Sequence, residues 1–278
     1  CIRDRPWIES GNRQQTLPVG ETVMTQKDNK LLTERFHEYF KLEMALTPEQ
    51  RKSVFHIRYR VYCDEFKFLN AEDNPNEQEI DEYDAYSHLC LITHKSSGMP
   101  AACVRVVPAV SPQGRYPLPY EKLGPEIIDQ PFVDSLDLPR PSLCEISRLA
   151  VDGAFRRRSG EAATRFGEID ALDITQMEKR TFGLIAVAAF LASAAAGGLS
   201  CHSSAFAMME PFLPRLMRRS GIIFERAGKD VDYHGLRAPY FIQMGSFLES
   251  MHTDLRDFYE SIHDCIESSM DPLPMAVE

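Results

Sequence analysis

Two charged side chains interrupt an otherwise apolar run, Leu143-Cys144-Glu145-Ile146-Ser147-Arg148-Leu149-Ala150-Val151. The run predicts a buried β-strand, and burying either charge without a partner would cost on the order of several kcal/mol. Glu145 and Arg148 are an odd number of positions apart, so a regular strand directs them to opposite faces. They share a site if a β-bulge intervenes. Otherwise they form a structural ion pair or face solvent on alternate sides.

The segments before this run indicate helices and a β-hairpin. Residues 88–94 and 101–107 are apolar and β-branched and are joined by a turn with glycine and proline, which is typical of a hairpin. Upstream, apolar residues recur at helical spacing over 31–44. The sequence Thr47-Pro48-Glu49-Gln50 carries a helix cap and predicts the start of a second helix, which extends to about residue 65.

The elements after the central run complete a sheet with helices. We expect an Ala-rich helix over 178–197, a strand over 201–208, a short helix over 210–220, strands over 222–226 and 240–244, and a helix over 247–268. This order predicts an α/β (α+β) fold with one mixed central sheet flanked by helices. We expect a loose N-terminal arm over 1–30, a single domain over 31–245, and a C-terminal helix and tail over 246–278.

Composition narrows the classes of function. The chain has 278 residues and a net charge of −10, which argues against nucleic acid as a partner because duplex binding needs a basic face. Its seven cysteines lack a CxxC pair, so we expect reduced thiols in the cytoplasm. The apolar run 184–199 is shorter than the ~20 residues of a membrane span. The histidines lack zinc-ligand spacing and no nucleotide-binding glycine motif occurs, so we expect no metal and no tightly bound cofactor.

Three further groups of polar residues are candidates for a site. Asp81 and Asp84 lie in an acidic turn, and Arg105 stands inside the second hairpin strand. Arg58 and Tyr62 share one helical face at positions i and i+4. Each group also has a plainer interpretation, namely a solvated turn, an edge-strand arginine and an amphipathic helix whose arginine reaches solvent.

Taken in order, these residues resemble a family pattern. The matching positions are Arg58-x3-Tyr62-x5-Phe68, Asp81-x2-Asp84, Arg105 and Glu145-x2-Arg148-Leu149-Ala150-Val151. The pattern is similar to that of acyl-homoserine-lactone autoinducer synthases, which belong to the GNAT superfamily of N-acyltransferases. Residues 209–216 and 233–240 are more similar to bacterial acyltransferases associated with the PEP-CTERM/exosortase system and to long-chain N-acyl amino acid synthases. The resemblance spans roughly residues 45–245.

The resemblance implies an acyl thioester as donor, on acyl carrier protein or coenzyme A, and an amine as acceptor. A partly buried Glu145 then removes the proton that an ammonium must lose before it attacks the thioester, because burial raises the pKa of a carboxyl. Main-chain N–H groups freed by a bulge would stabilise the oxyanion. By the same resemblance, Asp81, Asp84, Arg105 and Arg148 shape a charged cluster at the cleft.

The resemblance also implies donor-binding residues. Arg156, Arg157, Arg158 and Gly160 follow the central strand, and Arg157-x2-Gly160-x-Ala162 fits the spacing of the superfamily's phosphate-binding loop. The alternative is a solvated basic loop. A second basic group, Arg215-Leu216-Met217-Arg218-Arg219, would attract an acidic carrier protein, so we favour that donor over coenzyme A. The Ala-rich helix either lines a channel for the acyl tail or packs in the core.

Departures from the autoinducer pattern favour a different acceptor. Phe68 stands where those synthases usually carry tryptophan, and the Tyr233-His234-Gly235-Leu236-Arg237 segment is not expected of them. Both features favour an amino acid or similar amine over S-adenosylmethionine. The residues expected to bind substrate or donor in addition to the basic loop are Arg58, Tyr62, Phe68, Tyr233, His234 and Arg237. Two alternatives stay open: an autoinducer synthase, and a non-catalytic module that binds acyl carrier protein or lipid.

Overall fold

The computed structural model describes residues 26–156, 178 and 181–270, and its centre is one mixed sheet. The spatial order is β1-β2-β3-β6-β7-β10-β8, with β9 paired to β10. The strands are β1 (Phe40–Met44), β2 (His88–His94), β3 (Pro100–Pro108), β6 (Leu143–Val151), β7 (Ser204–Met209), β8 (Glu225–Arg226), β9 (Val231–Asp232) and β10 (Leu236–Gln243). All neighbours are antiparallel except β6 and β7, which are parallel. The expected mixed α/β architecture is confirmed.

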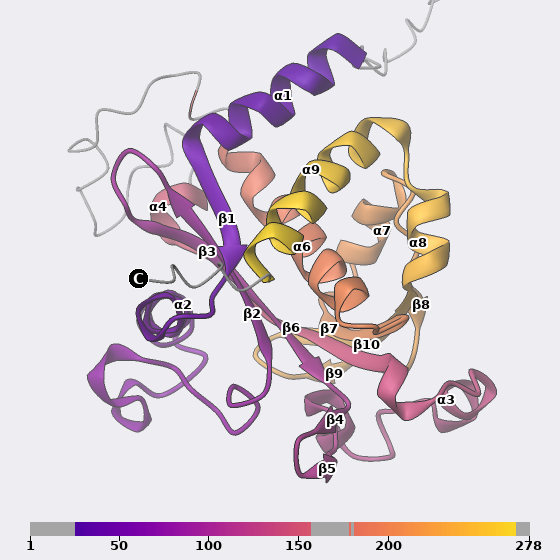
Figure 1. Ribbon diagram of the computed structural model, residues 1–278. Coiled ribbons are helices and arrows are strands. Elements are labelled where there is room, and N and C mark those ends of the chain that lie inside the picture. The colour runs from indigo at the N-terminus through magenta and orange to yellow at the C-terminus, as the bar shows by residue number, and fades with distance from the viewer. Residues whose placement is uncertain (1–25, 157–177, 179–180, 271–278) are drawn as a thin grey trace, which may run out of the picture.

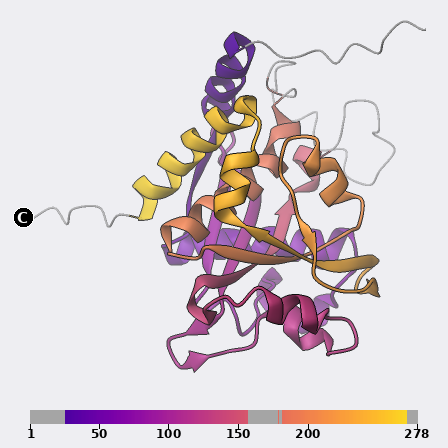
Figure 2. The same ribbon diagram turned by 90° about the vertical axis from the view of Figure 1, so that its right-hand side faces the viewer.

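Helices cover both faces of this sheet (Figures 1 and 2). On one face lie α1 (Gln26–Tyr39), α6 (Ile185–Leu199) and α9 (Thr253–Met270), and on the other lies α2 (Pro48–Tyr59). Strand β2 shows why both faces are buried: Cys90 and Ile92 pack in the α6 cluster, whereas Leu89 and Leu91 pack against α2. This continuous apolar run is what a strand covered on both sides requires.

The expected start of the second helix is confirmed in detail. The Thr47 side chain accepts a hydrogen bond from the backbone N–H of Gln50, and Gln50 Oε1 accepts one from the backbone N–H of Thr47, so the capping box is complete. After Tyr59 the helix continues as a wider π-helical turn over Arg60–Glu65. That turn carries Tyr62, whose hydroxyl donates to the carbonyl of Leu149 at 2.9 Å.

Two expected helices have different bounds in the structure. The first ends at Tyr39, and the alternating Phe40-Lys41-Leu42-Glu43-Met44 forms β1 instead, with Phe40, Leu42 and Met44 buried. The terminal helix is divided into α8 (Met244–Ser250) and α9, because Met251 is extended and buried between them. In both places, packing against the sheet overrides a local helical pattern.

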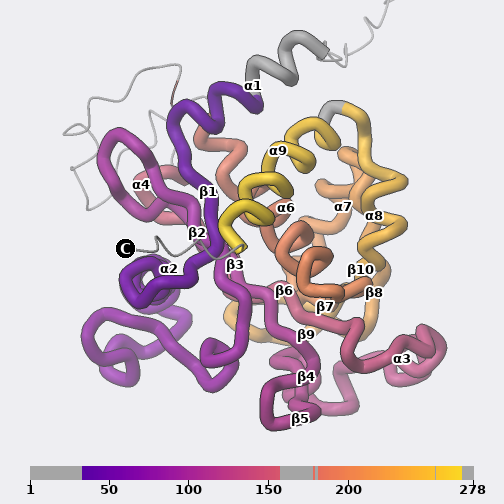
Figure 3. The backbone as a smooth tube through the Cα atoms, viewed as in Figure 1, coloured from indigo at the N-terminus to yellow at the C-terminus, as the bar shows by residue number. Residues whose placement is uncertain are grey.

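The proline-rich excursion covers the lower end of the sheet (Figure 3). It holds a small hairpin of β4 (Val110–Ser111) and β5 (Gly114–Arg115), a 3₁₀ turn over Pro119–Leu123, α3 (Gln130–Ser135) and a second 3₁₀ turn over Arg140–Ser142. The aromatic ring of Tyr120 stacks on that of Phe206 in β7 at a centroid distance of 4.4 Å. The excursion thereby places the backbone of Tyr120 over the central strands.

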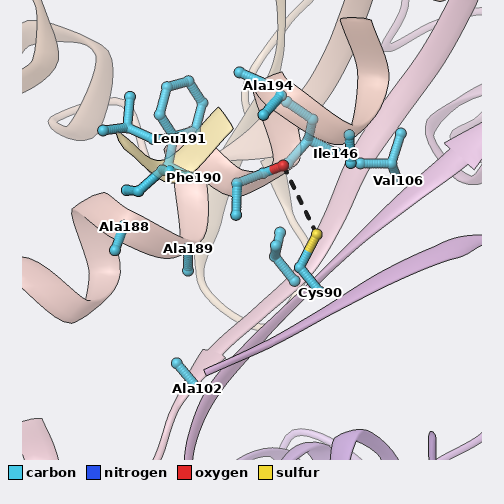
Figure 4. Packing of buried hydrophobic residues seen from close by; sticks show 14 of the residues in the cluster. Cys90, Ala102, Val106, Ile146, Ala188, Ala189, Phe190, Leu191 and Ala194 are labelled. Carbon is cyan, nitrogen blue, oxygen red and sulfur yellow. Dashed lines mark hydrogen bonds between the residues drawn. The ribbon is translucent and has the colours of Figure 1, made fainter. Parts of the chain in front are cut away.

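The Ala-rich helix α6 is a core helix. Its small side chains let it approach the sheet closely, and Figure 4 shows Ala188, Ala189, Phe190, Leu191 and Ala194 packed with strand residues. By length and composition the segment Phe182–Leu199 could cross a membrane, but 61% of it is buried inside the protein. Core packing is therefore the correct interpretation of this helix.

Candidate active site

The sheet opens between β6 and β7, and a cavity occupies the opening. The last paired residues of these parallel strands are Ile146 and Ala207, although β6 continues to Val151 and β7 to Met209. The empty space in and in front of this cavity, open solvent included, is about 680 Å³. Its walls are Tyr62, Phe68, Leu69, Pro119, Tyr120, Leu123, Glu145, Ile146, Ser147, Arg148, Met208, Tyr233, His234 and Arg237. No residue of α6 is among them.

A β-bulge brings Glu145 and Arg148 to the same cavity. Cys103 pairs with Ala150 and Arg105 with Ser147, so one residue of β3 faces two residues of β6. Arg148 sits at φ 53°, a left-handed conformation that a side chain with a Cβ rarely adopts. The bulge reverses the side on which Arg148 emerges. The β-bulge that Glu145 and Arg148 need in order to share a site is therefore present.

Glu145 is a buried carboxyl group whose protonation changes near neutral pH. Only 2% of it is exposed, and its Oε2 accepts a hydrogen bond from the backbone N–H of Tyr120 at 2.8 Å. Burial raises the pKa of Glu145 from 4.5 to about 8, against the opposing effects of the Tyr120 hydrogen bond and the charges of Arg105 and Arg148. A carboxyl with this pKa is suited to accept a proton from an ammonium group.

Behind the cavity wall, three arginines and three carboxylates form a buried ionic network. Arg58 forms a bidentate pair with Asp84, at 2.7 and 2.9 Å, and also pairs with Glu79. Arg105 reaches Asp81 at 2.5 Å and Asp84 at 3.0 Å. Because the charges balance, the network is an anchor that joins α2, β3 and β6.

Arg148 links the network to the cavity. Its guanidinium contacts Glu79 at 3.1 Å and Asp81 at 3.4 Å on one side, and lies over the Tyr62 ring at 5.8 Å on the other. Burial alone would raise the pKa of Asp84, but the hydrogen bonds and charge of Arg58 hold that pKa at about 2. The pKa of Glu79 is lowered for the same reason, by Arg58 and Arg148 against the effect of burial. These carboxylates are thus ionised at neutral pH and fix the position of Arg148.

This geometry divides the expected catalytic and binding residues into two groups. Glu145 and Arg148 line the cavity, whereas Asp81, Asp84 and Arg105 lie in the network behind it. The expectation that Arg58 contacts substrate is wrong, because its side chain is 0% exposed and makes its ion pairs inside the network. Arg58 instead positions the carboxylates.

Glu79, which joins Arg58 to Arg148, is a site residue that was not predicted from the sequence. A signal was present, because Glu79 precedes Asp81 by two residues in a segment without helical structure. Residues at i and i+2 of an extended chain point to the same side.

Aromatic rings from two distant segments form the outer wall of the cavity. Phe68 stacks on His234 at 5.4 Å and lies 6.5 Å from the ring of Tyr62. The Arg237 guanidinium also lies over the Phe68 ring, 5.7 Å from its centroid. Burial lowers the pKa of His234, and the charges of Arg237 and Arg148 lower it further. The imidazole is therefore neutral at pH 7. Five of the residues expected to bind substrate or donor line the cavity at this wall, namely Tyr62, Phe68, Tyr233, His234 and Arg237.

Of the loop that is expected to bind the donor, only Arg156 lies within the described residues. Arg156, at the end of α4 (Gly153–Arg156), pairs with Glu65 and lies 4.7 Å from the Phe66 ring. Arg157, Arg158 and Gly160 lie outside the described residues.

The described residues also include a buried thiol beside Glu145 and a group of possible metal ligands. Burial raises the pKa of the Cys144 thiol, so this residue next to Glu145 is a poor nucleophile. The metal-ligand cluster found there, His263, Asp264 and Glu267, is carried on α9 and is half-buried to exposed.

A family of known proteins matches the part of the sequence that forms the central strands and the ionic network. Residues 57–165, which include β2, β3, β6 and the ionic network, match the family described as an acetyltransferase (GNAT) domain. No curated protein matches the sequence.

The solved structures compared with this chain are similar in fold at low sequence identity. TofI, solved in a ternary complex with an inhibitor and MTA, aligns with a TM-score of 0.50 and 16% identity over 76% of this chain and 95% of its own. The AHL synthase LasI aligns at 0.49 and 14% over 77% and 98%. FeeM, an N-acyl amino acid synthase from uncultured soil microbes, aligns at 0.47 and 12% over 79% and 97%. Residues 57–165 therefore match an acetyltransferase (GNAT) domain, and the chain shares its overall fold with TofI.

Proposed function

We propose that the protein is an N-acyltransferase that moves a long-chain fatty acyl group from a thioester to the amino group of an amino acid or similar amine. The observation that supports this most directly is the buried Glu145 in the opening between β6 and β7. A base at that position meets an amine and a thioester carbonyl inside one cavity. The identity of the acceptor and the link to the PEP-CTERM/exosortase system stay predictions from sequence.

The proposed reaction proceeds by attack of the amine on the thioester carbonyl. Glu145 accepts the proton that the bound ammonium must lose and releases it to solvent. The free amine nitrogen then forms a bond to the carbonyl carbon, and the carbon–sulfur bond breaks. The second nitrogen proton neutralises the departing thiolate, so an amide and a thiol result. Because β6 loses its β7 partner after Ile146, its backbone N–H groups on that side face the cavity and are our candidates for stabilising the oxyanion.

This proposal predicts product formation with a defined pH dependence. The purified protein incubated with palmitoyl-loaded donor and a panel of α-amino acids should release N-palmitoyl amino acids, detected by mass spectrometry. The rate should rise with pH and level off above about 8, because Glu145 is ionised only above its raised pKa. Formation of an acyl-homoserine lactone from S-adenosylmethionine would identify an autoinducer synthase instead. Acyl binding without any transfer to an amine would indicate the non-catalytic module.

The donor that we propose is an acyl carrier protein, with acyl-coenzyme A as the alternative. We also propose that the reaction takes place in the cytoplasm. Helix α7 (Leu213–Arg218) begins five residues after the cavity residue Met208 in the sequence, and Arg215 and Arg218 on it and Arg219 at its C-terminal cap are exposed. Phe212 and Leu216 are exposed beside these arginines. An acidic protein with an apolar contact point fits a surface of this kind.

Charge reversal on α7 tests the carrier protein. The double variant R215E/R218E should raise the KM for palmitoyl-loaded acyl carrier protein at least tenfold at low salt, because repulsion replaces electrostatic attraction. The KM for palmitoyl-coenzyme A and the melting temperature should stay within twofold and a few degrees of wild type. Equal KM changes for both donors would contradict a role of this surface in recognising the carrier protein.

A further inference from the structure

The positive charges at the cavity are compensated unequally. Arg148 is paired with Glu79 and Asp81, and the two arginines behind it are paired within the same network. Arg237 also lines the cavity, but its guanidinium has no ion pair with any of the residues that the structure describes. Its Nε is buried and has no hydrogen-bond partner there. Buried guanidinium donors in proteins are ordinarily satisfied, so this group is set to receive a ligand.

The position of Arg237 is fixed by the hairpin that carries it. Residues 233–235 form the turn between β9 and β10, where His234 and Gly235 have φ values of 55° and 100°. The carboxylate of Asp232, an acidic neighbour, accepts a hydrogen bond from the N–H of Gly235 at 3.2 Å and so belongs to the turn. The Arg237 guanidinium lies over Phe68. A guanidinium held on an aromatic ring keeps its planar donor edge available to a planar anion.

A proton acceptor and a cation therefore face one cavity. Glu145, on β6, is the acceptor for a proton from an amine, and Arg237, at the aromatic wall, has no ion pair among the residues that the structure describes. We propose that Arg237 binds the carboxylate of the acceptor, so the acceptor is an amino acid whose amine reaches Glu145 while its carboxylate stays at Arg237. This inference rests on the proposed function and names the substrate class and the residue that selects it. Charge-assisted bidentate pairs of this kind are among the stronger hydrogen-bonded contacts in proteins.

Arg237 is a binding residue in this scheme, and its removal should affect the acceptor alone. The variant R237Q should raise the KM for amino acids about 10- to 100-fold and leave the KM for the thioester donor within twofold. Wild-type protein should acylate each amino acid at least tenfold more efficiently, in kcat/KM, than the corresponding carboxamide. R237Q should lose that preference, and R237K should restore part of it because a lysine retains the charge without the planar fork.

A matched control and a binding measurement separate this inference from the proposed function. R226Q removes an exposed arginine of the neighbouring β8, which pairs with Asp230 at 2.6 Å, and should change neither constant. Titration of the amino acid without donor should show binding to wild type that weakens at least tenfold in R237Q.

Three results would overturn the inference. The first is a raised KM for the donor in R237Q, which would place a donor phosphate at Arg237. The second is equal use of amino acids and carboxamides by wild type. The third is amino acid binding that is the same in R237Q as in wild type. If wild type binds amino acids through Arg237 but transfers no acyl group to any amine, the carboxylate site stands and the proposed function fails.

Discussion

The variant E145Q should lose about 100- to 10,000-fold in kcat with every acceptor, because an amide cannot accept the proton of an ammonium. Glutamine has nearly the same size as glutamate, and its carbonyl oxygen can still accept the hydrogen bond from the N–H of Tyr120. The KM for donor and acceptor should change little. Single-turnover measurement of N-acyl product with saturating donor separates the chemical step from product release.

The same variant should be more stable than wild type in alkaline buffer. The folded-state pKa of Glu145, about 8, lies above its unfolded value of 4.5, so ionisation in the fold is penalised once the pH exceeds 4.5. The penalty is absent below pH 4.5, grows as the pH rises to 8, and is constant above it. The free energy of unfolding of E145Q should therefore match that of wild type near pH 4.5 and exceed it by a few kcal/mol at pH 8.5, on the order expected for this shift.

A folding defect would not make E145Q both less active and more stable than wild type. E225Q is the matched control, because Glu225 is exposed on β8, and it should change neither property. Wild-type turnover by E145Q would remove Glu145 as the base. An E145Q protein that is inactive and also less stable at every pH would indicate a structural role for the carboxyl group.

The variant R58M should lower the free energy of unfolding by about 3–5 kcal/mol at pH 7, because it leaves buried carboxylates without their main partner. Arg58 is fully buried and makes ion pairs with Glu79 and Asp84. Methionine fills much of the same space, so a loss of this size reports the uncompensated charges rather than a cavity. Equilibrium unfolding in urea measures it.

The destabilisation by R58M should depend on pH in a predictable direction. Asp84 has a folded-state pKa of about 2, below its unfolded value of 3.8, so the network stabilises the fold above pH 3.8 and this contribution is lost as the pH falls toward 2. Wild type and R58M should thus differ less at pH 3 than at pH 7. R226M removes an exposed arginine and should have little effect. A loss in R58M no larger than in R226M would show that the network contributes little to stability.

Local signals in the sequence predicted much of the fold. The central strand over 143–151, the hairpin before it and the capped helix at Thr47 are all present, because their apolar periodicity and cap residues act over a few positions. β1 was missed because Phe40 and Met44 fit a helical spacing as well as an alternating one. Only pairing with β2 decides between these two periods.

The site was less predictable, because it depends on contacts between distant segments. The sequence could state only that Glu145 and Arg148 share a cavity if a bulge is present, and the bulge is set by pairing with β3. The stacking of Phe68 on His234, and the absence of an ion pair to Arg237 within the described part of the chain, depend on how the β9–β10 turn meets the π-helical turn and the residues after it. Neither contact leaves a signal in the spacing of either segment.

The β9–β10 turn also affects how readily the protein can change in evolution. Tyr233 in this turn and Leu236 directly after it are exposed, at 38% and 58%, while the ionic anchor of Arg58 and Asp84 lies elsewhere in the interior. Exchanges at such exposed positions usually alter stability by no more than about 0.5 kcal/mol. Descendants of this chain could therefore acquire new acceptors by altering a short surface loop, with the proton-transfer apparatus and the interior left as they are.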